Sequence, residues 1–214
     1  MNYIKRYQIL YRFYINNPNP TTELIYHSAF ELLIAVILSA QSTDRQVNKV
    51  TNVLFSLASS PQLMLHLGQD KLKKCIKSVG LYNKKSENII KTCQLLVNKY
   101  NSTIPENRDA LENFPGVGRK TANIILNTIF GWSTIAVDTH VFRLCNRTHF
   151  ALGNSVKTVE NKLLILVPVE FKNKCHYWMV MHGRYVCVAK NPQCHICYIA
   201  DLCKKNLTVK KNCF

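Results

Sequence analysis

The chain has 214 residues, 47% of them hydrophobic, with 28 Lys and Arg against 12 Asp and Glu and a formal net charge of +16. This composition excludes a disordered chain and an acidic protein, and it favours a polyanionic partner such as nucleic acid. The N-terminus has no signal-peptide pattern, and the longest apolar run, residues 30–40, falls short of the ~20 residues that span a bilayer. We therefore expect a cytoplasmic protein that uses no membrane.

Apolar residues recur at helical spacing along most of the chain, and no stretch alternates as a strand does. The first predicted helix covers residues 3–14 and ends before Asn17-Pro18-Asn19-Pro20, a sequence that breaks helices. Further helices are predicted at residues 30–40, 44–56, 61–67, 70–79, 85–100, 108–114, 119–130, 138–147, 156–167 and 171–185. The pattern predicts an all-α protein of about ten helices.

A turn rich in Pro and Gly, residues 114–118, separates two of these predicted helices. Gly116 and Gly118 allow backbone angles that other residues resist, and they let the chain approach another molecule closely. The first amides of the following helix lie at the positive end of its dipole, where a phosphate can bind. The pattern is typical of a helix–hairpin–helix at residues 108–130, but these residues alone leave open a turn that binds nothing.

Lys120 lies in the first turn of the second hairpin helix, where a cation is electrostatically disfavoured. With Arg119 beside it, the neutral and nucleophilic amine is favoured, which makes Lys120 a candidate nucleophile. Asp138 follows an apolar run and could either cap the next helix or stabilise positive charge at the edge of a pocket. The residues alone leave both roles of Asp138 open.

Five of the nine cysteines lie near the C-terminus. Cys187, Cys194, Cys197 and Cys203 have the spacing C-x6-C-x2-C-x5-C, which is close enough to enclose a soft metal centre. Zinc sites usually pair two short Cys-x-x-Cys segments, and only one is present here, so the spacing leaves zinc and an iron–sulfur centre open. Cys213 lies outside the pattern and is expected to be a free thiol.

The segments FPGVGRKTANIILN and AVDTHVFRLCNRT resemble the hairpin and trailing-aspartate motifs of the helix–hairpin–helix DNA glycosylases, and among these the endonuclease III family of glycosylase/AP lyases in base-excision repair. SAQSTD, GLYNKK, HGRYVC and the terminal cysteines extend the resemblance over essentially the whole chain. It implies two helical domains flanking a DNA-binding cleft. A six-helix domain would cover residues 22–132, and an iron–sulfur domain would combine residues 1–21 and 133–214.

The resemblance also implies the reaction and its residues. Lys120 would attack C1′ of an oxidised pyrimidine nucleotide, assisted by Asp138, and the resulting Schiff base would allow β-elimination 3′ to the abasic site. Gln41 would fill the space of the flipped-out nucleotide, and Leu81 would separate the opposite strand. The implied DNA contacts are Gln41, Leu81, Gly116, Gly118, Arg119 and Lys190. The partner would be damaged double-stranded DNA, bound by a monomer.

By the same resemblance, the four spaced cysteines would hold a [4Fe–4S] cluster whose role is mainly architectural. The chain past Asp138 has only three acidic residues and an excess of nine positive charges, which we expect to serve DNA phosphates rather than lesion choice.

Three other functions would share parts of this pattern. An adenine-mismatch glycosylase would lack the hairpin lysine, so Lys120 counts against it. A non-catalytic DNA-binding module or redox sensor would need neither Lys120 nor Asp138, and a zinc-stabilised helical scaffold would need no iron.

Overall fold

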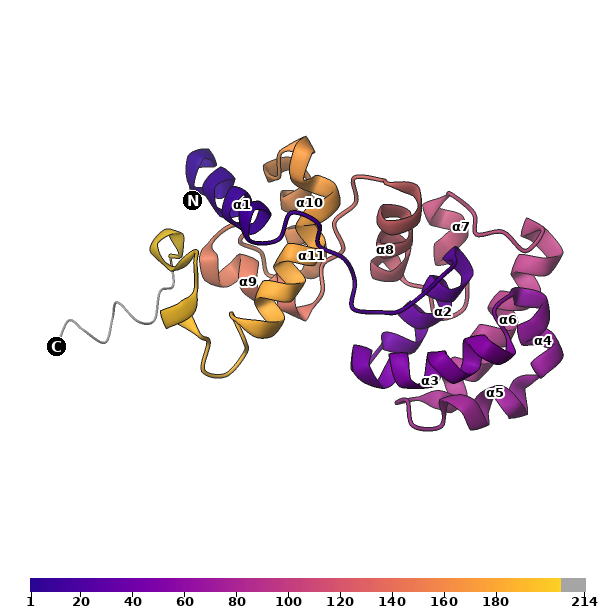
Figure 1. Cartoon of the computed structure of the whole chain (residues 1–214). Coiled ribbons are helices and arrows are strands. Elements are labelled where there is room, and N and C mark those ends of the chain that lie inside the picture. Colours follow the sequence, from indigo (N-terminus) through magenta and orange to yellow (C-terminus); the bar gives the residue numbers. More distant parts are fainter. Residues whose placement is uncertain (205–214) are drawn as a thin grey trace. The chain divides into compact units, whose positions relative to one another are not determined.

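The computed structural model describes residues 1–204, and within them it contains eleven α-helices, two short 3-10 helices and no strand (Figure 1). The prediction of an all-α fold is confirmed for this part of the chain. Cys213 lies outside the described residues. No helix in the described part is long and apolar enough to cross a membrane.

The helices divide into two compact units, which we name by their motifs. The hairpin unit is Thr22–Phe130, and the cysteine unit combines Met1–Thr21 with the chain from Gly131 onward. The predicted boundary lies two residues later, after residue 132. The hairpin unit contains seven helices, α2 to α8, including the short α7 (Arg108–Glu112). This is one more than the resemblance implies, and it equals the number that the periodicity predicts for this segment.

The hairpin unit is built around α2 (Ala29–Ser39), in which every residue from Phe30 to Leu38 is buried. A helix that is apolar on all sides needs neighbours on all sides. These neighbours are α3 (Asp44–Leu57), α6 (Tyr82–Tyr100) and α8 (Arg119–Phe130). The helices α4 (Pro61–Leu67) and α5 (Gln69–Ile76) pack against α6, and α7 packs against α8.

The cysteine unit is built around α11 (Val169–Tyr185), which packs against α9 (Thr139–Thr148) and α1 (Tyr3–Asn16), while α10 (Val156–Leu166) packs against α9. At the crossing of α9 and α11, a Cβ atom on Gly183 would lie 2.9 Å from the carbonyl oxygen of His140. Only glycine allows that approach without a shift of the backbone. The close crossing brings the end of α11, where the cysteine loop begins, onto α9.

Side-chain caps set several helix starts, as the Ser, Thr, Asn and Asp residues in the sequence suggest. The capping residues of α2, α3, α4, α7, α9 and α10 are Ser28, Thr43, Ser60, Asn107, Asp138 and Ser155. The start of α6 differs from the prediction: the helix begins at Tyr82 rather than at residue 85. Leu81 precedes it in the left-handed conformation, with a φ of 59°.

Candidate functional site

The hairpin turn is held by two buried side chains, Phe114 and Val117, and by the hydrogen bond from the Val117 amide to the Phe114 carbonyl. Gly116 has a φ of 81°, and a Cβ atom there would lie 2.8 Å from Nδ2 of Asn88. Gly118 is exposed, and a Cβ atom there would meet no atom within 4 Å. The fold therefore requires glycine at position 116, whereas packing within the unit gives no reason for a glycine at position 118.

Lys120 and Arg119 are exposed in the first turn of α8, directly after this turn. The helix is anchored beneath them by Ala122, Ile125 and Leu126, which are fully buried. This packing fixes the backbone from which the two exposed side chains extend. Lys120 lies in the first turn of α8, as the sequence predicts.

Asp138 lies at the N-terminus of α9 in the cysteine unit, so it and Lys120 belong to different units. Its Oδ1 atom accepts hydrogen bonds from the backbone amides of His140 and Val141, each at 2.9 Å. The capping role, left open by the sequence, is thus observed. The cap also fixes the position of the carboxylate. The residues just before Asp138 are buried, and the carbonyl of one of them, Ala136, accepts a 2.8 Å hydrogen bond from His176 Nδ1.

Gln41 and Leu81 are brought together by the fold, although forty residues separate them in the sequence. Both side chains are exposed, and both residues have positive φ angles, 54° and 59°. A Cβ atom on Gly80 would lie 3.1 Å from the carbonyl oxygen of Gln41. A hydrogen bond between Gln46 and Ser78 joins the segments that flank the two residues. The two loops therefore form one surface feature of the hairpin unit.

The four spaced cysteines line one cavity in the cysteine unit, together with apolar side chains that include Leu144. Burial raises the pKa of the Cys197 thiol to about 11, and the three other thiols add to this rise. Thiols that disfavour one another's ionisation in this way are stabilised as thiolates by a bound metal centre.

The arrangement brings together the donor set that a metal centre needs. A tetrahedral zinc ion takes four sulfur ligands, and a [4Fe–4S] cluster takes one cysteine at each iron. Four thiols around one cavity fit either centre.

Two arginines of α9 tie the cysteine loop to the helix. Arg147 donates to the carbonyls of Val188 at 2.6 Å and Ala189 at 2.7 Å, and its Nη1 lies 3.6 Å from Cys187 Sγ. Arg143 Nε donates to the Cys187 carbonyl at 3.0 Å. Lys190 is exposed on the loop that these bonds hold.

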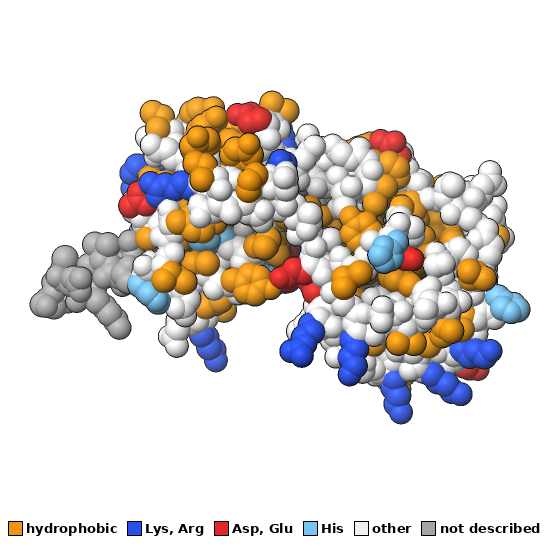
Figure 2. Space-filling view, viewed as in Figure 1, with side chains coloured by type: hydrophobic (Ala, Val, Ile, Leu, Met, Phe, Trp, Pro, Cys, Tyr) orange, Lys and Arg blue, Asp and Glu red, His pale blue; other side chains and the backbone are white. Residues whose placement is uncertain are grey.

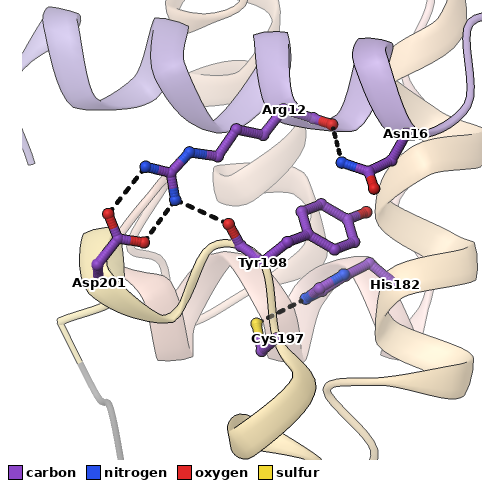
Figure 3. A network of polar contacts seen from close by, with 6 residues as sticks. All are labelled: Arg12, Asn16, His182, Cys197, Tyr198 and Asp201. Carbon is purple, nitrogen blue, oxygen red and sulfur yellow. Dashed lines mark hydrogen bonds and ion pairs between the residues drawn. The ribbon is translucent and has the colours of Figure 1, made fainter.

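The far end of the loop is tied to α1 (Figure 3). Arg12 donates to the Tyr198 carbonyl at 2.7 Å and to Asp201 at 2.8 Å, and this pairing lowers the pKa of Asp201. His182 is buried, which lowers its pKa to about 4, and its Nε2 lies 3.4 Å from Cys197 Sγ. No spacing in the sequence distinguishes these supporting residues from ordinary surface or core residues, so they could not be predicted: Arg12, Arg143, Arg147 and His182.

Two family models match the chain. Residues 34–168 match the HhH-GPD superfamily of base excision DNA repair proteins, and residues 187–203 match the iron–sulfur binding domain of endonuclease III. Endonuclease III of Escherichia coli (strain K12) is 59% identical over 204 residues, 95% of this chain and 97% of that protein. Endonuclease III of Haemophilus influenzae is 60% identical over 204 residues, with the same two coverages.

Solved structures agree with these matches. The structure of a trapped endonuclease III–DNA covalent intermediate has a TM-score of 0.92 and 40% sequence identity, covering 98% of this chain and 99% of that one. The resemblance inferred from the motifs and the expected iron–sulfur cofactor are both confirmed. The chain belongs to the endonuclease III family of the HhH-GPD superfamily.

Proposed function

We propose that this chain removes oxidised pyrimidines from duplex DNA and cuts the strand 3′ to the resulting abasic site, with Lys120 as the nucleophile of both steps. One observation carries the proposal. Lys120 is exposed at the start of α8, next to Gly118, a glycine for which packing within the unit gives no reason. Attack on a sugar of DNA requires a reactive amine close to a place where the protein backbone can approach the DNA.

The chemistry follows from the two side chains. The unprotonated Nζ of Lys120 attacks C1′, the bond from C1′ to the base breaks, and the base leaves with its bonding electrons. The Asp138 carboxylate stabilises the positive charge that develops on the sugar and helps to remove the proton of the amine. The nitrogen lone pair then expels O4′ from C1′, which opens the sugar ring as O4′ takes a proton and gives a protonated Lys120–C1′ imine. This imine acidifies the 2′ proton, whose loss expels the 3′ phosphate. Hydrolysis of the imine releases the enzyme.

Gln41 and Leu81 would act on the duplex before this chemistry. A base whose sugar is attacked at C1′ must leave the helix, and the space that it leaves must be filled. Two exposed side chains on adjoining loops are suited to this task. Gln41 would occupy the vacated space, and Leu81 would enter the opposite strand.

The DNA backbone would be held by amides and cations. The turn at Gly116 and Gly118 with Arg119 would bind phosphate, and Lys190 would bind phosphate from the cysteine loop. Lys and Arg side chains gather on α3 and α5 and the loops beside them (Figure 2). Arg45, Lys74 and Lys77 are exposed there, near the loops that carry Gln41 and Leu81.

Cys187, Cys194, Cys197 and Cys203 would hold the [4Fe–4S] cluster. Its contribution when bound would be architectural, because the loop from Cys187 to Cys203 has only two short 3-10 helices, both of three residues. Arg147 and Arg12 would keep the loop on α9 and α1. We propose that the protein acts on damaged double-stranded DNA as a monomer.

Borohydride trapping on a thymine-glycol duplex tests the proposal, because reduction of the imine links the protein to the DNA covalently. We expect a trapped adduct with the wild-type protein and none with Lys120→Ala. Lys91→Ala is the matched control, since Lys91 is an exposed lysine of the same unit that pairs with Glu87. Undiminished trapping with Lys120→Ala would overturn the proposal. Binding without strand cleavage by the wild type would identify a non-catalytic module instead.

A further inference from the structure

Lys85 is a buried lysine in the first turn of α6, with only 5% of its surface exposed. Lysine is rarely buried unless it is paired. Its Nζ donates to the carbonyls of Leu38 at 2.8 Å and Ala40 at 2.6 Å, and to the Ser42 hydroxyl at 3.3 Å. All three acceptors lie at the end of α2 or just beyond it, in the loop that carries Gln41.

The end of α2 is a favourable place for a cation. The last carbonyls of a helix have no partner within it and lie at the negative end of its dipole. Burial lowers the pKa of Lys85. The hydrogen bonds of its ammonium group go to carbonyl and hydroxyl oxygens rather than to a carboxylate. The lysine therefore binds backbone and loop rather than forming a buried ion pair.

The contacts of Lys85 reach both sides of Gln41 and also Leu81. Its side chain binds Ala40 and Ser42, the two neighbours of Gln41, while its backbone amide donates to the Leu81 carbonyl at 3.0 Å. Gln41 and Leu81 both hold positive φ angles, which non-glycine residues adopt only when the surroundings impose them. The bond to Leu81 is the first backbone hydrogen bond of α6, so the Lys85 side chain ties the Gln41 loop to the helix start that directly follows Leu81.

We propose that Lys85 is a positioning residue that holds the Gln41 and Leu81 loops in one fixed arrangement, so that both side chains enter the duplex together. This inference rests on the proposed function of those two loops. Loops that are already ordered lose little conformational entropy when DNA binds. Small displacements of the side chains that position the DNA reduce the reaction rate strongly. Without the Lys85 ammonium, the hydrogen bonds that tie the Gln41 loop to the start of α6 would be lost.

The test compares an abasic site in a duplex with the same abasic site in a single strand, by borohydride trapping. The single strand leaves no vacated stack to fill, so it does not need the two loops. Lys85→Met keeps a long unbranched side chain and removes the three hydrogen bonds. We expect it to lower trapping on the duplex by about tenfold and to change trapping on the single strand by less than about twofold.

Ile89→Ala is the matched control, because Ile89 is fully buried one turn further along α6 and its truncation destabilises the same unit. Both variants are assayed at a temperature at which circular dichroism shows them folded. We expect Ile89→Ala to leave the ratio of duplex to single-strand trapping unchanged. Equal loss of both activities in Lys85→Met would show that the lysine serves only the fold, and would overturn the inference.

A double-mutant cycle measures the coupling between Lys85 and Gln41 in duplex trapping, which a purely structural role of Lys85 would not produce. If Lys85 acts through Gln41, then Gln41→Ala should weaken duplex trapping far less in the Lys85→Met background than in the wild type. Additive losses would contradict the inference. Failure of the proposed function is distinguishable, because the wild type would then trap neither substrate. A wild type that traps both, with an unchanged ratio in Lys85→Met, refutes the inference about Lys85 alone.

Discussion

Gly116 and Gly118 stand two residues apart in the hairpin turn but meet different surroundings. Gly116 is held in the left-handed region, against the side chain of Asn88. Gly118 faces open space, so a methyl group would fit within the unit. In the sequence, both belong to the same Pro/Gly turn pattern. Their surroundings in the folded unit distinguish the glycine that folding needs from the one that is available for binding.

We predict that alanine affects stability at the first of these positions and DNA binding at the second. Gly116→Ala should lower the free energy of unfolding by about 1–3 kcal/mol, because it adds both backbone strain and a close contact with Asn88. Gly118→Ala should change stability by less than about 1 kcal/mol but weaken duplex binding, because the methyl group would stand between the turn and a phosphate. Urea unfolding and duplex titration measure the two effects. Wild-type binding by Gly118→Ala would exclude a contact there.

At the scale of elements, α9 shows how a structural role and a chemical role can share one residue. Asp138 caps the helix through Oδ1, and the buried segment before it fixes the place where the helix starts. From the sequence, capping and catalysis were alternatives. In the structure they are compatible, because a capped carboxylate is also a positioned one.

The two roles of Asp138 can be separated by substitution. Asp138→Asn should keep the cap and lie within about 0.5 kcal/mol of wild-type stability, whereas Asp138→Ala should lose about 1 kcal/mol. Single-turnover base release should fall in both, because neither keeps the charge. Ser155→Ala is the control, since Ser155 caps α10 by accepting a 3.1 Å bond from the Thr158 amide. It should lose stability and keep the rate. A full rate in Asp138→Asn would contradict the catalytic role.

At the scale of the whole molecule, each unit has its own core. The core of the hairpin unit runs from Leu24 to Leu126, and that of the cysteine unit joins α1 to the chain after Gly131 through residues such as Phe13 and Trp178. Phe13 also contacts His182 and Tyr198, so the N-terminal helix supports the cysteine loop. Loss of the cluster should therefore destabilise the cysteine unit and leave the core of the hairpin unit intact.

We predict that Cys187→Ser abolishes the visible absorbance of the iron–sulfur cluster, weakens duplex binding and opens the loop to proteolysis. Hydrogen exchange in α2 should remain slow, because the core around α2 belongs to the hairpin unit. Cys75→Ser is the matched control, since Cys75 is half-buried in α5, outside the four-cysteine pattern. Unchanged absorbance in Cys187→Ser would remove Cys187 from the ligands, and faster exchange throughout α2 would contradict independent cores.

Much of the fold could be predicted from local patterns. Helical periodicity and capping residues depend on neighbours three or four positions away, so they can be read directly, as the start of α3 at Asp44 shows. The start of α6 could not, because no local pattern in the sequence indicates the left-handed conformation of Leu81 before it. The choice between zinc and an iron–sulfur centre rested on the family match of residues 187–203, because four thiols around one cavity fit either centre.

Most helices, the hairpin motif, the four-cysteine pattern and the family could be predicted from the amino-acid sequence, because each depends on residues that are near one another in the chain. The folded structure shows in addition that Gln41 and Leu81 lie on adjoining loops, that the Lys85 side chain binds the Gln41 loop, and that arginines of α9 and α1 hold the cysteine loop. These contacts join residues far apart in sequence. Their hydrogen bonds exist only once the cores have formed, and no local pattern encodes them.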